Sequence, residues 1–329
     1  MRNAHHESGT GFTECLLKAD DKRNAVIRIC WNKYHTPHSV DEAIRLLDHY
    51  DGRARVVGGG TDLLLEIQQG HSPAVEALVD TSRIAGMDRI SNEHDHIVIG
   101  CAVTHTQIVN DETIVRSGTC LVEGCGVIGG PQVRNVATLA GNVAHAMPAG
   151  DGSIGLLALG GEIEIADTGG YRWMPLQKAF LGPGKSAIDH HRALLTRLRF
   201  PLTKSGEGSA FTRIMRPQGV ALPMISMAVR LQLDDDDTIT SIRISLGPAG
   251  PVPYLAEPAM DQLMGAIAGF DQYSAAADTV LASVPLRTSK HRATREYREE
   301  MIRMHLPIIL ERAAERARSG QVIPEGVGQ

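Results

Sequence analysis

The first third of the chain switches between helix-like and strand-like patterns of hydrophobic and polar residues. TPHSVDEAIRLLDHY predicts a helix, because Ser39 and Glu42 have the spacing of a capping box. One apolar face follows, formed by Ala43, Leu46 and Leu47. The segments RVV and HIVIGCAVT predict strands, since β-branched residues dominate them and turn-forming residues flank them. A short apolar segment, VIRICW, precedes this region. The alternation indicates a mixed region of helices and strands.

The middle of the chain lacks any regular period. GGPQVRNVATLAGNVAHAMPAGD is rich in small residues, and such a segment either coils over the surface or lines a site. GEIEIAD then predicts a strand. Further on, MISMAVRLQLDDDDTITSIRISLGPAG predicts two strands around a solvated acidic turn at residues 234–237. TREYREEMIRMHLPIILERAAERA is helical in pattern apart from Pro307. We therefore expect a separate α+β domain in the C-terminal part.

Composition places the chain among globular proteins of two or three domains. It has 329 residues, of which 43% are hydrophobic and 22% charged. The net charge of −5 and the lack of a basic stretch argue against a nucleic-acid partner. The sequence contains no run of about 18 apolar residues, so we expect no membrane span. Residues 1–26 are polar and predict a flexible extension, and their lack of an apolar signal-peptide core makes the cytoplasm the expected location.

The cysteines are scattered and odd in number. Reduced structural thiols are typical of such a set in a cytosolic protein, and no second pair completes a metal site around CLVEGC. We expect no metal ligands among them. The five are Cys15, Cys30, Cys101, Cys120 and Cys125.

Glycine-rich loops are the main candidates for chemistry. In ARVVGGGTDLLLEI, residues 58–60 form either a tight turn or a cradle of backbone N–H groups for phosphate. The Rossmann fingerprint fails, because Leu63 stands where its third glycine belongs. AFLGPGKSA ends like a P-loop, but Ala179 replaces its first glycine and Pro183 interrupts it. Two loops, at 58–60 and 138–151, remain as a possible pair that holds one dinucleotide.

Four ordered motifs carry a family resemblance: VVGGGTDLLLEIQQG, IGCAVTHTQI, GPQVRNVATLAGNVAHAMPAGD and FLGPGKSAI. Over residues 28–315 the chain resembles the FAD-binding medium subunit of molybdenum hydroxylases, such as carbon monoxide dehydrogenase, xanthine dehydrogenase and 4-hydroxybenzoyl-CoA reductase. The resemblance implies an α+β fold. A vanillyl-alcohol-oxidase-type (PCMH-like) FAD-binding domain of two α+β subdomains would precede a C-terminal domain with a three-stranded antiparallel sheet and helices. The expected boundaries are 1–26 for the extension, 27–203, 204–317, and 318–329 for a tail.

The resemblance also implies which residues contact FAD. The first glycine loop would wrap the pyrophosphate, and a second motif of the form T-x-G-G-N/S, in which Ala140 replaces a glycine, would contact the flavin or its phosphates. Asp151 would reach the ribityl–ribose side of the cofactor, and Phe211 would lie beside the flavin ring. Arg216 would face the electron acceptor, and Leu194 or Leu195 would pack on the isoalloxazine. Ordinary core or surface roles stay open for these last residues and for His145. The full expected set is Val57, Gly58, Gly59, Gly60, Thr61, Asp62, Leu63, Thr138, Gly141, Asn142, His145, Gly150, Asp151, Leu194, Phe211 and Arg216.

The implied function is electron transfer, with no catalytic and no metal-binding residue on this chain. Non-covalent FAD would receive electrons from 2Fe-2S clusters on a small subunit and pass them to NAD, a quinone or another acceptor. A large molybdopterin subunit would hydroxylate the substrate, in a heterotrimer that dimerises. An extra cluster is not expected, because the chain lacks the inserted four-cysteine loop of the 4-hydroxybenzoyl-CoA reductases. The alternatives are a self-contained flavin oxidase or reductase, or a scaffold without flavin, for which Ala140 is the only hint.

Overall fold

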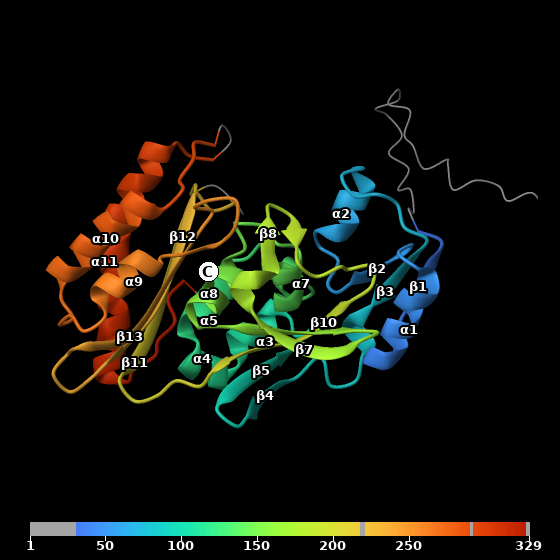
Figure 1. The fold of residues 1–329 in the computed structure, drawn as a ribbon, viewed down its shortest axis with the longest axis horizontal. Coiled ribbons are helices and arrows are strands. Elements are labelled where there is room, and N and C mark those ends of the chain that lie inside the picture. The colour runs from blue at the N-terminus through green and yellow to red at the C-terminus, as the bar shows by residue number, and fades with distance from the viewer. Residues whose placement is uncertain (1–30, 218–220, 290–291, 327–329) are drawn as a thin grey trace, which may run out of the picture.

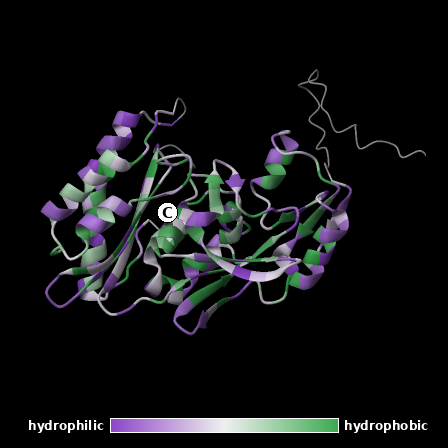
Figure 2. Cartoon of the chain, in the orientation of Figure 1, coloured by the Kyte–Doolittle hydropathy of each residue, from purple (hydrophilic) through white to green (hydrophobic). Residues whose placement is uncertain are grey.

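The computed structural model describes residues 31–217, 221–289 and 292–326. The expected N-terminal extension and most of VIRICW lie outside these residues. Figure 1 shows an elongated molecule in which the N-terminal sheets lie at one end and a sheet covered by long helices lies at the other. Figure 2 shows hydrophobic and hydrophilic stretches in both the strands and the helices. The chain is therefore an α+β protein, as the resemblance implied.

A three-stranded parallel sheet forms the first layer. Its order is β1 (Lys33–His35), β3 (Ala77–Asp80), β2 (Ala54–Val57), and α1 (Val40–Tyr50) packs against it. The predicted cap of α1 is present, because Ser39 Oγ accepts a hydrogen bond from Glu42 N–H at 3.1 Å. The Glu42 carboxylate accepts from His38 N–H rather than from Ser39, so the capping box is not closed in its usual form. After β2 the chain turns into α2 (Leu63–Gln68).

A five-stranded antiparallel sheet lies next to it. Its order is β4 (Ile90–Glu93), β5 (His96–Gly100), β10 (Leu194–Pro201), β6 (Glu162–Asp167), β7 (Gly170–Pro175). The strand predicted over residues 96–104 ends early, because Ala102 N–H bonds to Met87 C=O and the chain turns there. The remaining elements of this half are η1 (Thr81–Arg83), η2 (Leu176–Ala179) and the hairpin of β8 (Phe180–Gly182) and β9 (Lys185–Ser186).

The segment without a regular period consists largely of short helices. These are α6 (Pro131–Arg134), α7 (Leu139–Ala144) and α8 (Asp151–Ala158), and they follow α3 (His105–Asn110), α4 (Glu112–Ser117) and α5 (Thr119–Gly126). α5 and α8 are buried along their whole length, so neither shows the one-sided pattern that marks a surface helix. Their burial explains why periodicity could not reveal them.

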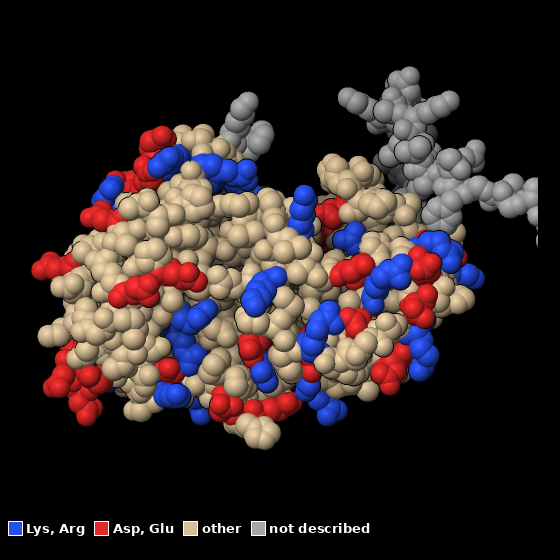
Figure 3. All heavy atoms as spheres, viewed as in Figure 1, with Lys and Arg blue, Asp and Glu red and all other residues tan. Residues whose placement is uncertain are grey.

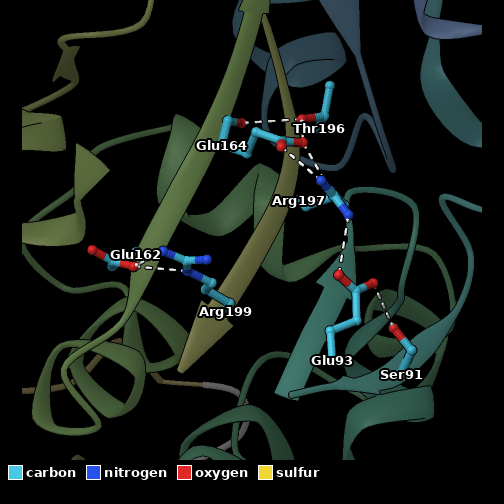
Figure 4. Close-up of polar contacts among 7 residues, drawn as sticks. All are labelled: Ser91, Glu93, Glu162, Glu164, Thr196, Arg197 and Arg199. Atoms are coloured by element: carbon cyan, nitrogen blue, oxygen red, sulfur yellow. Dashed lines mark hydrogen bonds and ion pairs between the residues drawn. The ribbon is translucent and has the colours of Figure 1, made fainter. Parts of the chain in front are cut away.

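Charged residues cover the solvent face of β10 and its neighbours. Arg197 forms two hydrogen bonds with Glu164, at 2.7 and 2.8 Å, and a longer contact with Glu93, while Arg199 pairs with Glu162 (Figure 4). The Arg199 guanidinium lies 4.1 Å from the centre of the Trp173 ring. Because arginines and buried apolar residues alternate along β10, the sheet presents one polar and one core-facing side. Each of these arginines has an acidic partner on a neighbouring strand. The network therefore stabilises the pairing of the strands rather than forming a charged binding site.

The C-terminal half is a second antiparallel sheet covered by helices. Its order is β11 (Glu207–Ile214), β12 (Ile225–Leu233), β13 (Ile239–Gly247), β14 (Tyr254–Leu255). Three long strands match the expected sheet, and the two-residue β14 adds an edge. On one side lie α9 (Glu257–Leu263), α10 (Phe270–Ser283) and α11 (Arg295–Ser319), as Figure 1 shows. At the predicted acidic turn, the Asp234 carboxylate accepts from the N–H groups of Asp236 and Thr238.

The helical pattern of the last segment corresponds to α11, which continues through Pro307, the one residue that does not suit a helix. Proline removes one N–H donor from the helix, whereas the side chains around it are buried against the sheet and α10. Those side chains include Ile302, Leu306 and Leu310, each fully buried. Tertiary packing therefore outweighs the local preference.

Buried ion pairs join the two halves. α5 and α8 pack against the face of the C-terminal sheet that α11 does not cover. Glu123 on α5 pairs with Arg316 on α11 at 2.7 Å, and Asp151 on α8 pairs with Arg213 on β11 at 2.9 Å. Among the described residues no helix is long and apolar enough to cross a membrane. Figure 3 shows acidic and basic side chains interspersed over the face in view, without a broad basic area of the kind that binds nucleic acid.

Candidate cofactor-binding site

A cavity of about 520 Å³ lies where the first glycine loop, the α7–α8 segment, β10 and β11 meet. Its volume is in the range of small-molecule and cofactor pockets. Most of the expected contact residues line this cavity. They are Val57, Gly58, Gly59, Gly60, Thr61, Asp62, Leu63, Thr138, Gly141, Asn142, His145, Gly150, Asp151 and Leu194.

The three glycines of the first loop differ in how strictly the structure requires them. A Cβ atom on Gly59 would overlap the carbonyl group of Val136 and lie 2.8 Å from the Cα atom of Ala137. Gly60 has a φ of +70°, which favours glycine. A Cβ atom on Gly58 would lie 3.3 Å from Thr138 Oγ1, a contact that a small shift relieves. At Gly59 the missing side chain thus makes room for the backbone that leads into the second loop rather than for phosphate.

The first loop offers unused hydrogen-bond donors to the cavity. Within the described ranges, the backbone N–H groups of residues 59–63 donate to no acceptor of the protein. Successive N–H groups in a turn with a left-handed residue form a concave site for anions. The loop therefore suits a phosphate or pyrophosphate group.

The second loop is held by its own side chains. Thr138 Oγ1 accepts from Gly141 N–H at 3.0 Å and caps α7. Asn142 Oδ1 accepts from both the N–H and the hydroxyl of Ser153, which ties α7 to the start of α8. Ala140 lies inside α7 without a positive φ, so its replacement of the usual glycine causes no backbone strain. The left-handed residue of this loop is Ala146, with a φ of +53°.

Asp151 lies in the cavity wall with both carboxylate oxygens already paired. Oδ2 accepts from Arg213 at 2.9 Å, and Oδ1 accepts from the Ser226 hydroxyl at 2.6 Å. Burial raises the pKa of Asp151 to about 6, although Arg213 and the hydrogen bond from Ser226 act in the opposite direction. The contact with the ribityl–ribose side stays a prediction.

Two expected contact residues are not brought to the wall. The Phe211 side chain is buried in the hydrophobic core, and its N–H donates to Glu123. Arg216 is likewise absent from the residues that line the cavity. Leu194 and Leu195 both line it, so the choice between them stays open.

The wall also contains polar residues that sequence reasoning missed, notably Arg55, His105, His190 and Arg213. Burial, followed by the charge of Arg134, lowers the pKa of His105 to about 4, and its Nδ1 lies 3.3 Å from the Cys125 sulfur. Arg55 directly precedes the VVGGG run, and Arg213 follows Phe211 by two residues. Their positions beside these motifs could therefore have identified both as candidates for the site. Nothing in the sequence pattern points to His190.

The described cysteines are buried free thiols. Cys101, Cys120 and Cys125 are each almost fully enclosed, and Cys101 lines the cavity. Burial raises the pKa of the Cys101 thiol to about 12, which keeps it protonated and unreactive. The sequence-based expectation of structural thiols fits these positions, while Cys15 and Cys30 lie outside the described residues.

Comparisons with known proteins identify the family to which the chain belongs. Residues 27–203 match the family described as FAD binding domain in molybdopterin dehydrogenase, and residues 209–313 match the CO dehydrogenase flavoprotein C-terminal domain. The xanthine dehydrogenase FAD-binding subunit of Escherichia coli O157:H7 is 29% identical over 270 residues, which cover 82% of this chain and 91% of that subunit. The carbon monoxide dehydrogenase medium chain of Hydrogenophaga pseudoflava is 27% identical over 251 residues, covering 76% and 86%.

Solved structures show the same architecture. A carbon monoxide dehydrogenase from Hydrogenophaga pseudoflava, lacking the Mo-pyranopterin moiety of its cofactor, superposes with a TM-score of 0.81 at 26% identity, covering 86% of this chain and 97% of that one. Quinoline 2-oxidoreductase from Pseudomonas putida 86, at 23% identity and a TM-score of 0.78, shares the fold. The FAD-binding match spans more than half of the chain, and the C-terminal match accounts for most of the remainder. The chain therefore belongs to the family of FAD-binding flavoprotein subunits of molybdenum hydroxylases, which are oxidoreductases.

Proposed function

We propose that this chain binds one FAD non-covalently in the cavity and transfers electrons within a molybdenum hydroxylase complex. The observation that carries the proposal is the meeting of two glycine-containing loops around one cavity, with unused N–H donors at residues 59–63. FAD, when bound, supplies the redox chemistry, because a flavin can exchange electrons one at a time or in pairs.

The residues of this chain bind and orient the cofactor. The N–H groups of the first loop hold the pyrophosphate, and Gly60 shapes that turn. Leu194 and Leu195 offer an apolar surface on which a flat ring system packs and from which water is excluded. The buried Asp151–Arg213 pair fixes the C-terminal sheet against the wall. None of these residues needs to act as a general acid or base.

The partners follow from family membership. We expect a large molybdopterin subunit that holds the substrate and a small subunit with 2Fe-2S clusters, in a heterotrimer that dimerises. Electrons reach this chain from the small subunit and leave to NAD, a quinone or another acceptor. Within the chain we propose an FAD-binding domain at 27–203 and a C-terminal domain at 204–317, because β10 ends at Pro201 and β11 begins at Glu207.

The test is to purify the full chain, record its visible spectrum and identify the released chromophore by chromatography. We expect one FAD per chain, released without proteolysis, and recovery of molybdopterin and iron–sulfur subunits when the tagged chain is isolated from its host. A colourless chain that cannot be reconstituted with FAD would overturn the proposal. Substrate turnover by the isolated flavin-loaded chain would instead identify a self-contained flavin oxidase or reductase.

A further inference from the structure

Arg292 lines the cavity with a side chain that no described residue holds. It belongs to the segment between α10 and α11, which lies on the C-terminal half in Figure 1, whereas β2 and α2, on either side of the first glycine loop, lie on the N-terminal half. Its N–H donates to Ser289 C=O at 3.3 Å, so its backbone is held in a turn. Its guanidinium makes no hydrogen bond or ion pair within the described ranges. It can therefore turn toward a ligand without breaking an existing contact.

The other arginines of the cavity wall already have partners. Arg213 pairs with the Asp151 carboxylate at 2.9 Å, and Arg55 donates to the Ser72 hydroxyl at 3.4 Å. Of the described arginines that line the cavity, Arg292 alone lacks a polar partner. Its donors are therefore available to a bound molecule.

Two further arginines add positive charge beside Arg292. Arg298 is 2% exposed, and its guanidinium donates to the carbonyl oxygens of Pro248 and Arg287, at 3.1 and 3.2 Å. No carboxylate of the described chain pairs with any of the three arginines. Burial, followed by repulsion from Arg287, lowers the pKa of Arg292. Three neighbouring cations without an acidic partner create a positive potential that attracts an anion.

Building on the proposed binding of FAD, we infer that Arg292 binds a pyrophosphate group in the cavity. A guanidinium presents paired N–H donors that match the spacing of phosphate oxygens. FAD carries its negative charge on its pyrophosphate, and so does a nicotinamide dinucleotide, whereas a quinone carries none. The same chemistry can therefore come from the cofactor or from an electron acceptor that enters the cavity. The place of Arg292 in a concave wall favours such a small anion over the surface of a partner protein.

Three variants isolate the contribution of Arg292. Arg292→Gln removes the charge and keeps much of the side-chain length, whereas Arg292→Lys keeps the charge but loses the paired donors. Arg295→Gln is the matched control, because Arg295 is close in the chain, pairs with Glu299 at 2.6 Å and does not line the cavity. Circular dichroism of each variant verifies that the fold is intact.

Dissociation constants for three probes identify the source of the pyrophosphate. The FAD-free full chain is titrated with FAD and with riboflavin, which lacks the pyrophosphate, and the FAD-loaded chain is titrated with NAD⁺. If the group belongs to FAD, Arg292→Gln should weaken FAD binding about tenfold and leave riboflavin binding unchanged. If it belongs to the acceptor, Arg292→Gln should weaken NAD⁺ binding about tenfold and leave FAD binding unchanged. Arg292→Lys should recover part of either loss, and Arg295→Gln should behave as wild type.

The outcomes distinguish this inference from the proposed function. If wild type binds no FAD, the proposed function fails. If wild type binds FAD and Arg292→Gln weakens neither FAD nor NAD⁺ by more than about twofold, only the inference is overturned. Equal weakening of FAD and riboflavin would overturn it as well, because riboflavin has no phosphate. Loss of the partner subunits from Arg292→Gln, with both affinities unchanged, would assign the arginine to a carboxylate of a partner instead.

Discussion

Gly59 and Val136 lie so close that a Cβ atom on the glycine would overlap the valine's carbonyl group. Val136 lies two residues before the second glycine loop, and its backbone packs directly on that of Gly59 in the first loop. This contact explains why the central residue of the first loop is a glycine. A side chain there would collide with the backbone at Val136, whether or not a ligand is bound. The loops consequently form one unit whose shape depends on both.

Gly59→Ala should therefore separate the loops. We expect a loss of about 3 kcal/mol in the free energy of unfolding, because backbone atoms cannot move aside as a flexible side chain can, and FAD should be lost on gel filtration. Urea unfolding and the flavin-to-protein ratio measure both effects. Gly58→Ala is the control, since its Cβ atom would lie 3.3 Å from Thr138 Oγ1. Equal behaviour of the two variants would contradict this account.

The buried Asp151 predicts a specific pH dependence of stability. Its pKa is raised from 3.8 to about 6 in the folded protein. The unfolded state therefore loses this proton first as the pH rises, and the stability that the neutral form contributes is present below about pH 4 and lost through about pH 6. In Asp151→Asn this contribution to the pH profile is absent.

The difference in unfolding free energy between wild type and Asp151→Asn should shift by about 3 kcal/mol against wild type between pH 4 and 7. Urea unfolding of both proteins across this range measures the shift, and the comparison cancels groups that titrate in both. A difference that stays constant with pH, or that shifts in favour of wild type, would show that Asp151 is not a buried carboxyl with a raised pKa.

The buried Glu123–Arg316 pair should be a major source of cohesion between the two halves. Glu123 also accepts from the N–H groups of Phe211 and Glu325, so removal of the arginine leaves a buried carboxylate without its charge partner. Arg316→Met should destabilise the chain by about 3–5 kcal/mol. Chemical denaturation measures this loss. Arg116→Ala, which breaks an exposed pair with Glu112, should change stability little; a comparable loss there would refute the distinction.

Phe211 should matter for stability but not for the cofactor. Its side chain is 5% exposed and packs in the core. Phe211→Leu should reduce the free energy of unfolding by about 1–2 kcal/mol and leave the FAD dissociation constant within about twofold of wild type. A tenfold weaker affinity in a stably folded variant would restore Phe211 to the ring contact that the family resemblance suggested.

Local sequence determined much of the secondary structure. Ser39 caps α1 because its hydroxyl oxygen accepts a hydrogen bond from the N–H group of Glu42, three residues later. This local bond does not depend on the rest of the fold. The strands around the acidic turn follow from short-range alternation and from the Asp234 side chain. The motifs also sufficed to identify the family, and most of the contact residues that they implied line the cavity.

Tertiary structure decided the contacts between distant residues. Sequence patterns did not reveal that Gly59 meets Val136, that Asp151 pairs with Arg213, or that Phe211 is buried beside Glu123. Nor did they place His190 in the wall or carry α11 through Pro307. Periodicity reports only which face of an element is apolar, whereas these features depend on which other elements pack against that face. Partners far apart in the chain meet only once the whole core has formed, as Glu123 and Arg316 do across 193 positions.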